Sequence, residues 1–529
     1  MRRFVFFLLL FVSLNVSAQT FDIIPLPQSV ELKKGEFVLG DKMIITYDSS
    51  VNEEMRQNAL LLSEYIKEQV GWNWIVTPNK AKNNVIRLVL DKKIKSEEGY
   101  KITISQKDLT VSAKTPAGVF YGIQALRKIV GAEGNKVLPC AVIEDSPRFP
   151  YRGTHLDCSR HFFPVEFIKK YIDILVLHGI NKFHWHLTDD QGWRFEVKRY
   201  PELIAKGSVR ECTVIGHNTP VYDNQPYGGY YTQEQCREIV RYAAERYIQV
   251  IPEIDMPGHM QGALCAYPEL GCTGGPYKVW SIWGVSDEVL CAGNPKTVEF
   301  LHGVLEELTD VFPSSLIHLG GDECPKIRWK ECPKCQAKIK ELGLTTENGK
   351  SLEDQLQSYL LKDAETFLAK KGRTVIGWDE VLEGGLGDNT WVMSWRGHDG
   401  GREAAKLHHN VIMAPVSHCY FDYYQTKNWN SEPMAFTADL PIEKVYSLEP
   451  IPSGLTDEES RYIQGVQCNL WSEYILSPQH AEYMLLPRLA ALCETQWMQA
   501  DKKDYKDFQS RLPRLINLYD RLGYTYHKL

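Results

Sequence analysis

Two adjacent acids near the middle of the chain are the most informative polar residues in the sequence. Asp322 and Glu323 end the segment 318–323 (HLGGDE), in which two glycines allow the backbone and a ligand to approach each other closely. A carboxylic acid in such a place can protonate a leaving oxygen and later accept a proton from water. Neighbouring residues on one strand point in different directions, so the two side chains are poorly placed to face each other across a substrate. We therefore predict that one acid transfers the proton while the other orients a substrate group beside it.

Short apolar segments alternate with longer amphipathic segments after residue 147, which is the pattern of β-strand and α-helix units around a parallel sheet. The eight candidate strands are residues 153–157, 182–188, 249–255, 316–320, 374–378, 390–395, 411–415 and 463–470. One intervening helix is expected to begin at a capping box formed by Thr232 and Gln235. Eight such units predict a (β/α)8 barrel, an α/β fold whose active site lies at the carboxyl ends of its strands.

Polar and aromatic residues are concentrated just past these predicted strands. They are Arg160, His161, Asp189, Asp190, Asp255, His259, Asp322, Glu323, Trp378, Asp379, Glu380, Trp395, Arg396, Tyr420, Asp422, Trp471 and Glu473. Aromatic faces can stack on a sugar ring, and charged groups can bind hydroxyls bidentately. This set is therefore typical of a carbohydrate site.

The chain before the barrel divides into two parts. Arg2 and Arg3 precede an apolar run and small residues follow it, so residues 1–18 are predicted to be a secretory signal peptide. Residues 19–146 mix strand-like and helical segments and predict a small α+β domain. A polar, proline-containing stretch marks the boundary with the barrel, residues 147–529. We expect the protein to be exported to the periplasm or the cell exterior.

Composition and charge exclude several classes of protein. The chain is 43% hydrophobic and 24% charged, which is ordinary for a globular protein and excludes disordered, collagenous and coiled-coil classes. Its formal net charge of −7 argues against nucleic acid as a partner. No segment after the leader approaches the roughly 18 apolar residues of a membrane-spanning helix. No nucleotide-binding glycine fingerprint is present among the strand ends.

Three longer motifs resemble those of the β-N-acetylhexosaminidases of glycoside hydrolase family 20. They are residues 184–194 (HWHLTDDQGWR), 252–259 (PEIDMPGH) and 318–323 (HLGGDE). The resemblance covers nearly the whole mature chain, because the family commonly carries a small α+β domain before its barrel. It implies an exo-acting, retaining enzyme that releases terminal β-linked N-acetylglucosamine or N-acetylgalactosamine from glycans, with no cofactor and no metal.

The resemblance also implies roles for individual residues. In substrate-assisted catalysis the substrate's 2-acetamido oxygen attacks the anomeric carbon and gives an oxazolinium-like intermediate. Glu323 would act as acid and then as base, with a pKa near the working pH. Asp322 would orient the acetamide, and Tyr420 would donate a hydrogen bond to the attacking oxygen. The sugar-binding residues implied are Arg160, Glu473 and Asp422 at the hydroxyls, and Trp378, Trp395 and Trp471 around the acetamide and ring.

Two further residues are implied as partners of the acid. Asp189 and His259 would tune the orientation and protonation of Glu323, although spacing alone does not decide between Asp189 and Asp190. Trp429 has no firm anchor in the pattern and is not assigned to the site.

Three other functions match parts of the sequence. A metal-dependent hydrolase would need several histidines to converge on one ion, but the later strand ends offer Trp and Tyr, so we expect buried, hydrogen-bonded roles for these histidines: His155, His184, His186 and His318. A non-catalytic carbohydrate-binding barrel would most simply have lost the acid, and Glu323 is present. A disaccharide-releasing (lacto-N-biosidase-like) or transglycosylating member of the same family would use the same catalytic residues. The natural glycan, the linkage and the oligomeric state stay open.

Thirteen cysteines are an odd number for an exported chain, so at least one is expected to be free or paired between chains. Cys272 and Cys291 flank a Gly-, Pro- and Trp-rich loop and are the preferred candidates for a disulfide. Cys332 and Cys335, with Cys324 upstream, have the spacing of zinc ligands. A fourth ligand is not apparent, and an oxidising compartment disfavours free thiolates. We expect structural or partly oxidised cysteines here.

Overall fold

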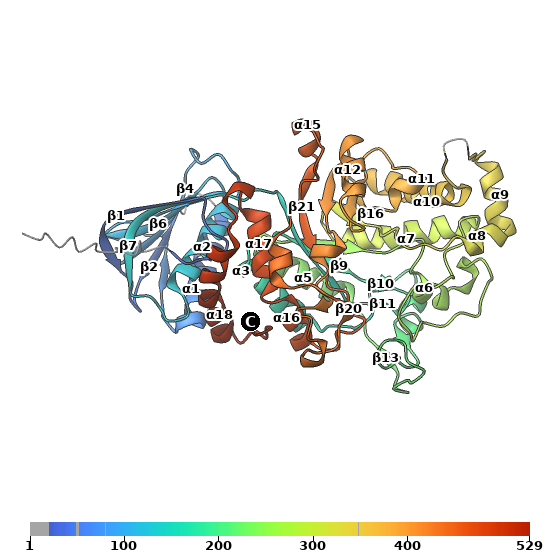
Figure 1. The fold of residues 1–529 in the computed structure, drawn as a ribbon, viewed down its shortest axis with the longest axis horizontal. Helices are drawn as coiled ribbons and strands as arrows, with labels where there is room; N and C mark the ends of the chain where they lie inside the picture. The colour runs from blue at the N-terminus through green and yellow to red at the C-terminus, as the bar shows by residue number, and fades with distance from the viewer. Residues whose placement is uncertain (1–20, 49–51, 80, 347–348) are drawn as a thin grey trace, which may run out of the picture.

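The computed structural model describes residues 21–48, 52–79, 81–346 and 349–529. These residues form an N-terminal sheet domain followed by a barrel (Figure 1). The predicted signal peptide, residues 1–18, lies outside the described residues. Within the described ranges, no helix combines the length and the apolar character that crossing a bilayer would require.

A seven-stranded mixed sheet in the order β1-β7-β5-β6-β4-β2-β3 forms the N-terminal domain. Its elements are β1 (Ser29–Val38), β2 (Ile44–Tyr47), α1 (Asn52–Val70), β3 (Ile75–Thr77), β4 (Val85–Leu90), β5 (Tyr100–Ile104), β6 (Asp108–Ala113), α2 (Pro116–Val130) and β7 (Val137–Asp145). Buried and partly exposed residues alternate along β5 and β6, and the helices α1 and α2 cover one face of the sheet (Figure 1). This arrangement confirms the predicted α+β domain.

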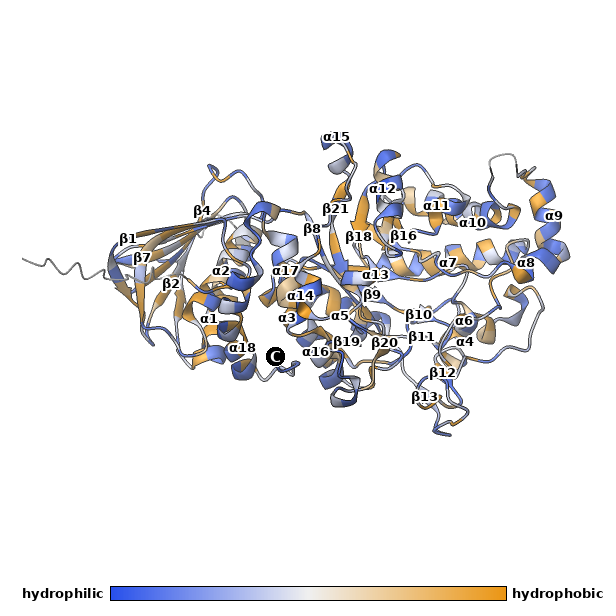
Figure 2. Cartoon of the chain, in the orientation of Figure 1, coloured by the Kyte–Doolittle hydropathy of each residue, from blue (hydrophilic) through white to orange (hydrophobic). Residues whose placement is uncertain are grey.

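Eight parallel strands close into the barrel. They are β8 (Tyr151–Asp157), β9 (Lys182–His186), β14 (Gln249–Glu253), β15 (Leu316–His318), β16 (Thr374–Trp378), β17 (Trp391–Ser394), β18 (Val411–Met413) and β21 (Ile463–Cys468). Every predicted strand overlaps one of them, so the predicted (β/α)8 barrel is confirmed. Figure 2 shows hydrophobic residues concentrated on these strands and on the helices beside them.

Several barrel strands end earlier than the sequence pattern predicts. β15 ends at His318 instead of Gly320, because Gly320 and Gly321 have φ angles of +67° and +91°, outside the β region. β14 ends at Glu253, two residues before Asp255. The residues released from the sheet at these ends are among those that carry polar side chains toward the centre of the barrel mouth.

Helices follow most of the strands and pack on the outside of the barrel. The longer ones are α3 (Val165–Leu177), α5 (Gln233–Ala244), α7 (Pro295–Val311), α10 (Leu352–Ala369), α12 (Asp399–Lys406), α16 (Pro478–Leu485) and α17 (Arg488–Trp497). The predicted capping box of Thr232 and Gln235 is present at the start of α5. The last helix, α18 (Tyr505–Leu522), packs against α1 and so brings the end of the chain back to the N-terminal domain (Figure 1).

The remaining elements lie in the connections between these strands and helices. They are β10 (Thr188–Asp189), β11 (Gly192–Trp193), α4 (Glu202–Ala205), β12 (Val209–Arg210), β13 (Tyr227–Gly228), α6 (Gln261–Ala266), η1 (Pro268–Leu270), α8 (Ile327–Glu331), α9 (Pro333–Glu341), α11 (Val381–Gly384), α13 (Val416–Cys419), β19 (Tyr423–Tyr424), η2 (Trp429–Ser431), β20 (Phe436–Asp439), α14 (Ile442–Tyr446), α15 (Asp457–Ser460) and η3 (Ala500–Lys502).

The two domains meet through a buried polar contact. Glu98 of the N-terminal domain accepts a hydrogen bond from Arg152 at 2.7 Å and another from Asn181 at 3.0 Å. Arg152 belongs to β8, and Asn181 precedes β9. The predicted domain boundary lies in the segment that links the end of β7 to the start of β8.

Candidate active site

A tight turn after β15 carries the two adjacent acids into the barrel mouth. Gly320 is required in this turn, because a Cβ atom there would lie 1.7 Å from Oδ1 of Asp255. The backbone N–H of Gly321 donates to the same oxygen at 3.1 Å. Glu323 itself has a φ of 46°, a backbone conformation that costs a non-glycine residue on the order of 1 kcal/mol. The turn thus holds the acids in a strained backbone that only this packing maintains.

A cavity of about 340 Å³ opens at the carboxyl ends of the strands. Eight of the residues that the sequence predicts for the site line it, namely Arg160, Asp322, Glu323, Trp395, Tyr420, Asp422, Trp471 and Glu473. The structure therefore brings together side chains that are more than 300 positions apart in the sequence. A volume of this size lies within the range of small-molecule pockets.

Trp378 lies one layer below the cavity. Its side chain is only 1% exposed, and its indole N–H donates to Oε1 of Glu253 at 3.0 Å. Its ring centre is 5.8 Å from that of Trp471, which does line the cavity. Trp378 thus supports the aromatic floor from beneath in this geometry.

His259 connects Glu323 to a pair of buried carboxylates. Nε2 of His259 lies 3.6 Å from Oε2 of Glu323, and Nδ1 lies 3.1 Å from Oδ1 of Asp189 and 3.3 Å from Oδ2 of Asp190. The Asp189 carboxylate raises the pKa of His259 well above its ordinary value, despite burial. Asp190 also accepts backbone hydrogen bonds from the loops at Gln261 and Ser286, both at 3.1 Å. Both acids therefore contact the histidine, and Asp190 also anchors loops.

The pKa of Glu323 differs from the sequence-based expectation. A group that works as acid and base was expected to titrate near the working pH. In the structure its pKa is lowered, because the imidazole of His259, 3.6 Å from the carboxylate, is a positively charged partner beside it. The expected influence of His259 on Glu323 is thus present, and in the ligand-free site it lowers the pKa of the carboxyl group.

Asp322 has the opposite environment. Burial raises its pKa well above the ordinary value of 3.8, and the neighbouring Asp255 raises it further. Burial likewise raises the pKa of Asp255 to about 7 and that of Glu380 to about 8. Among the described residues, none hydrogen-bonds to Oδ1 of Asp322, although this atom is buried. An unpaired buried acceptor is costly, so this oxygen is suited to a donor from a ligand.

Another part of the cavity wall is a charged group around Arg160. The guanidinium lies 3.1 Å from Asp157, 3.0 Å from Asp189 and 3.7 Å from Glu473. Burial raises the pKa of Asp422 well above its ordinary value, with a further contribution from the charge of Glu473. Asp422 Oδ1 is buried and has no hydrogen-bond partner in the described part of the chain. This wall therefore offers one fixed cation and several acceptors to a polyhydroxylated ligand.

Aromatic side chains form a further part of the cavity wall. The Trp395 and Tyr420 rings lie nearly parallel with centres 6.0 Å apart, and the Trp395 indole donates to Glu380 at 2.9 Å. Burial raises the pKa of the Tyr420 phenol well above its ordinary value, so the hydroxyl keeps its proton and can donate it in a hydrogen bond. Flat faces and a fixed hydroxyl donor together fit an apolar group that carries a carbonyl oxygen.

The four histidines considered as metal ligands surround a buried glutamate under the cavity floor. Glu253 lies 3.0 Å from His184, 2.5 Å from His186 and 2.9 Å from His318. His155 packs edge-on against His184, with ring centres 4.9 Å apart. These contacts give the histidines the buried, mostly hydrogen-bonded roles that the sequence predicts for them.

Sequence reasoning missed the part of the cavity wall that comes from several loops and short elements at the barrel mouth. The missed lining residues are Asn218, Trp283, Gly284, Val285, Val416, Tyr423, Phe436 and Tyr474. Trp283 lies in the Gly-, Pro- and Trp-rich loop between Cys272 and Cys291, and its backbone N–H donates to Asn218 at 2.9 Å. The unusual composition of this loop is the sequence signal that could have assigned it to the cavity wall. Trp429 does not line the cavity and stacks on Tyr424 with ring centres 5.0 Å apart.

Comparison with known proteins identifies the family of both domains. Residues 149–500 match the catalytic domain of glycosyl hydrolase family 20, and residues 20–146 match domain 2 of that family. A beta-hexosaminidase of Porphyromonas gingivalis is 42% identical to the chain over 96% of it, and the match spans 64% of that relative's length. A beta-hexosaminidase of Vibrio furnissii is 35% identical, with 90% of this chain and 76% of the relative covered.

Solved structures of similar proteins also align with nearly the whole chain. An exo beta-N-acetylglucosaminidase from Vibrio harveyi, determined in complex with N-acetylglucosamine, aligns with a TM-score of 0.84 and 32% identity. The alignment covers 96% of this chain and 78% of the Vibrio chain. A beta-N-acetylhexosaminidase from Streptomyces coelicolor aligns with a TM-score of 0.82 and 28% identity over 96% of this chain and 98% of its own.

Proposed function

The chain belongs to glycosyl hydrolase family 20, and from that premise we propose that it is a retaining exo-glycosidase. It removes terminal β-linked N-acetylglucosamine or N-acetylgalactosamine from the non-reducing ends of glycans. The similar proteins named hexosaminidases and the charged and aromatic cavity at the barrel mouth support this function. The single observation that carries it is the buried, unpaired Oδ1 of Asp322 beside the exposed carboxylate of Glu323.

In the first step the substrate supplies the nucleophile. The N–H of the 2-acetamido group donates to the unpaired oxygen of Asp322, which turns the acetamido carbonyl oxygen toward the anomeric carbon. The Tyr420 hydroxyl holds the carbonyl oxygen in place. The oxygen attacks as the glycosidic bond breaks, and Glu323 gives its proton to the departing oxygen. A cyclic oxazolinium cation and the shortened glycan result.

The positive charge of the intermediate matches the electrostatics of the site. Asp322, Asp255 and Glu380 have raised pKa values because burial and mutual repulsion disfavour their charged forms. A cation beside Asp322 removes that disadvantage and favours its ionised form. In the second step Glu323 takes a proton from water, the water oxygen attacks the anomeric carbon, and the acetamide reforms. Each of the two attacks, first by the acetamido oxygen and then by water, inverts the anomeric carbon, so the product retains the configuration of the substrate.

The first test separates the roles of the two acids. For a glycan leaving group, Glu323→Gln is expected to lower kcat by roughly 10²- to 10⁴-fold, because the leaving oxygen departs unprotonated. With an acidic aryl leaving group the loss should be much smaller, whereas Asp322→Asn should stay impaired with both substrates. Exposed Glu299→Gln is the matched control and should leave both rates unchanged. Equal behaviour of the two site variants would contradict this division of roles.

The second test asks whether the acetamide is the nucleophile. Aryl β-N-acetylglucosaminide should be hydrolysed, whereas the aryl β-glucoside, which lacks the acetamido group, should not be turned over. A thiazoline analogue of the intermediate should inhibit strongly, because it resembles the state that the site stabilises. Comparable hydrolysis of the two aryl glycosides would refute substrate assistance and leave an ordinary two-carboxylate mechanism.

We also propose that the enzyme is exported after removal of residues 1–18. The basic start, the short apolar run and the small residues before position 19 support this. Amino-terminal sequencing of the protein recovered from its native cells tests it, and an intact Met1 would exclude cleavage.

A further inference from the structure

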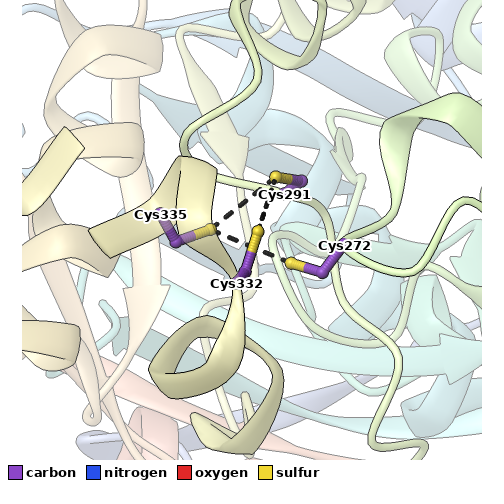
Figure 3. A group of neighbouring side chains, drawn as sticks. All are labelled: Cys272, Cys291, Cys332 and Cys335. Atoms are coloured by element: carbon purple, nitrogen blue, oxygen red, sulfur yellow. Dashed lines mark hydrogen bonds between the residues drawn. The ribbon is translucent and has the colours of Figure 1, made fainter. Parts of the chain in front are cut away.

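Four cysteines from a loop and from the start of a helix lie close together (Figure 3). Cys272 and Cys291 lie at the two ends of the loop that follows α6 and η1. Cys332 and Cys335 lie at the start of α9. The sequence grouped Cys324 with the last two, but their companions in the structure are Cys272 and Cys291. The further ligands are thus supplied by Cys272 and Cys291, which lie 63 and 44 residues before Cys335 in the chain.

The sulfur positions have the dimensions of a tetrahedral metal site. Sγ of Cys291 lies 3.7 Å from Sγ of Cys332 and 3.7 Å from Sγ of Cys335, and Sγ of Cys335 lies 3.8 Å from Sγ of Cys272. All four sulfurs lie within 4.8 Å of one another. Zinc–sulfur bonds of about 2.3 Å in a tetrahedron place the sulfurs about 3.8 Å apart. The measured separations therefore match a shared central ion.

The same distances argue against disulfides. A disulfide would hold two sulfurs about 2.05 Å apart and would leave the other two at a greater distance. Instead, Cys291 is equally close to Cys332 and Cys335, so the sulfurs do not separate into two pairs. All thirteen cysteines lie in the part of the chain that the structure describes, and each is free there. The predicted disulfide between Cys272 and Cys291 is therefore not formed in this structure.

The surroundings of the cluster are those of a closed structural site. Cys291 and Cys335 are fully buried, and Cys332 is 5% exposed. Apolar side chains pack around the cluster, among them those of Val289, Trp329, Ile339 and Leu356. The backbone N–H of Gly293 hydrogen-bonds to the sulfurs of Cys291 and Cys335. A Cβ atom on Gly293 would lie 2.1 Å from the carbonyl oxygen of Lys334, so glycine permits the two loops to approach this closely.

We propose that Cys272, Cys291, Cys332 and Cys335 bind one zinc ion as thiolates in a closed tetrahedral site. Each thiol releases its proton to solvent when its sulfur binds the ion. Four sulfur ligands with no open position make the site structural, with no part in the hydrolysis. The ion also explains how buried thiolates persist in an exported protein, because coordination protects them from oxidation.

The site stabilises one wall of the sugar cavity. The loop between Cys272 and Cys291 carries Trp283, Gly284 and Val285, which line the cavity. Cys332 and Cys335 follow the segment that begins at Asp322 and Glu323. The ion therefore links both ends of the loop between Cys272 and Cys291 to the segment that follows Asp322 and Glu323. Its removal should loosen the wall without changing the chemistry of the acids.

The test measures metal directly in the full-length protein. Protein purified without chelating reagents should contain about one zinc per chain by plasma mass spectrometry. The double variant Cys332→Ser/Cys335→Ser should lose it, whereas Cys265→Ser, a partly buried cysteine outside the cluster, should retain it. Wild-type protein without zinc, with either four reactive thiols or two disulfides at these positions, would overturn the proposal.

A second measurement does not depend on the folding of the variants. Zinc in the wild-type protein is exchanged for Co²⁺, which in a tetrahedral all-thiolate site gives intense sulfur-to-cobalt absorption bands in the near ultraviolet together with visible bands. We expect both sets of bands. Stoichiometric iron in place of zinc, or a cobalt spectrum of a site with oxygen or nitrogen ligands, would refute the zinc–thiolate assignment and leave the hydrolase function untouched.

Discussion

At the scale of single residues, Asp322 and Glu323 are sequence neighbours with opposite electrostatics. Burial and Asp255 raise the pKa of Asp322, whereas His259 lowers the pKa of Glu323. Pairs of titratable groups whose pKa values are pushed apart often have different catalytic roles. The proton that Glu323 must deliver is therefore held mainly by His259 in the free enzyme. A sugar that excludes water from the cavity favours the neutral arrangement, in which the proton moves to Glu323 and His259 becomes neutral.

This proton sharing predicts the pH dependence of a histidine variant. The pKa of His259 is raised well above 6.5, so in the wild type the pair of His259 and Glu323 keeps its shared proton well above pH 6.5. The basic limb of the kcat/KM profile should therefore begin only at the higher pH at which this pair loses the proton. In His259→Gln the proton must reside on Glu323 alone, and the basic limb of the kcat/KM profile should move to lower pH. The maximal rate should fall by less than the roughly 10²- to 10⁴-fold loss expected without the acid.

The matched control is His302→Gln, which removes a histidine that pairs with Asp363 and lies outside the cavity. Its kcat/KM profile should overlay that of the wild type. An unchanged basic limb in His259→Gln would show that the two groups do not share the catalytic proton.

At the scale of elements, periodicity predicts the barrel because each strand is a local apolar segment between turn residues. The strand ends are predicted less well, since the turn at Gly320 depends on the contact of its neighbour Gly321 with Asp255, which follows another strand, β14. The wall loops are predicted least, because they follow no period and are positioned by long-range contacts. The hydrogen bond from Trp283 to Asn218 and the meeting of Cys291 with Cys332 are examples.

The turn after β15 gives a prediction about one methyl group. In Gly320→Ala the new Cβ would lie 1.7 Å from Oδ1 of Asp255, so the turn must shift and move both acids. A displacement of about 1 Å in such a site can cost about 10²-fold in rate, and we expect at least that loss in kcat. Gly372→Ala is the control, because Gly372 has a similar φ of +70° but open space around it. It should lower stability by about 1 kcal/mol and leave kcat unchanged. Near-normal kcat in Gly320→Ala would contradict the argument.

At the scale of the whole molecule, the ion pair of Glu98 and Arg152 is one of the contacts that join the two domains, beside the packing of α18 on α1. The arginine side chain is 1% exposed and that of the glutamate 23% exposed. Arg152 also donates to the carbonyl oxygens of Gly179 and Phe149, so it belongs structurally to the barrel. Removing one member of a buried pair is costly because the other charge stays buried and unpaired. The domain interface is therefore sensitive to a change that leaves the cavity intact.

Arg152→Met is accordingly expected to destabilise the protein by about 3–5 kcal/mol, measured by urea unfolding at neutral pH. Replacing both partners, in Arg152→Met/Glu98→Met, should recover part of this loss because no unpaired charge remains.

The pKa of Glu98 is lowered below its ordinary value of 4.5 in the folded protein, so the pair stabilises the fold above that pH and loses its contribution as the pH falls. The difference between Arg152→Met and the wild type should therefore shrink on acidification. Glu449→Gln, which breaks the more exposed pair with Arg148, should cost about 1 kcal/mol or less. A similar cost for both single variants would mean that the contact between the domains does not depend on the buried pair.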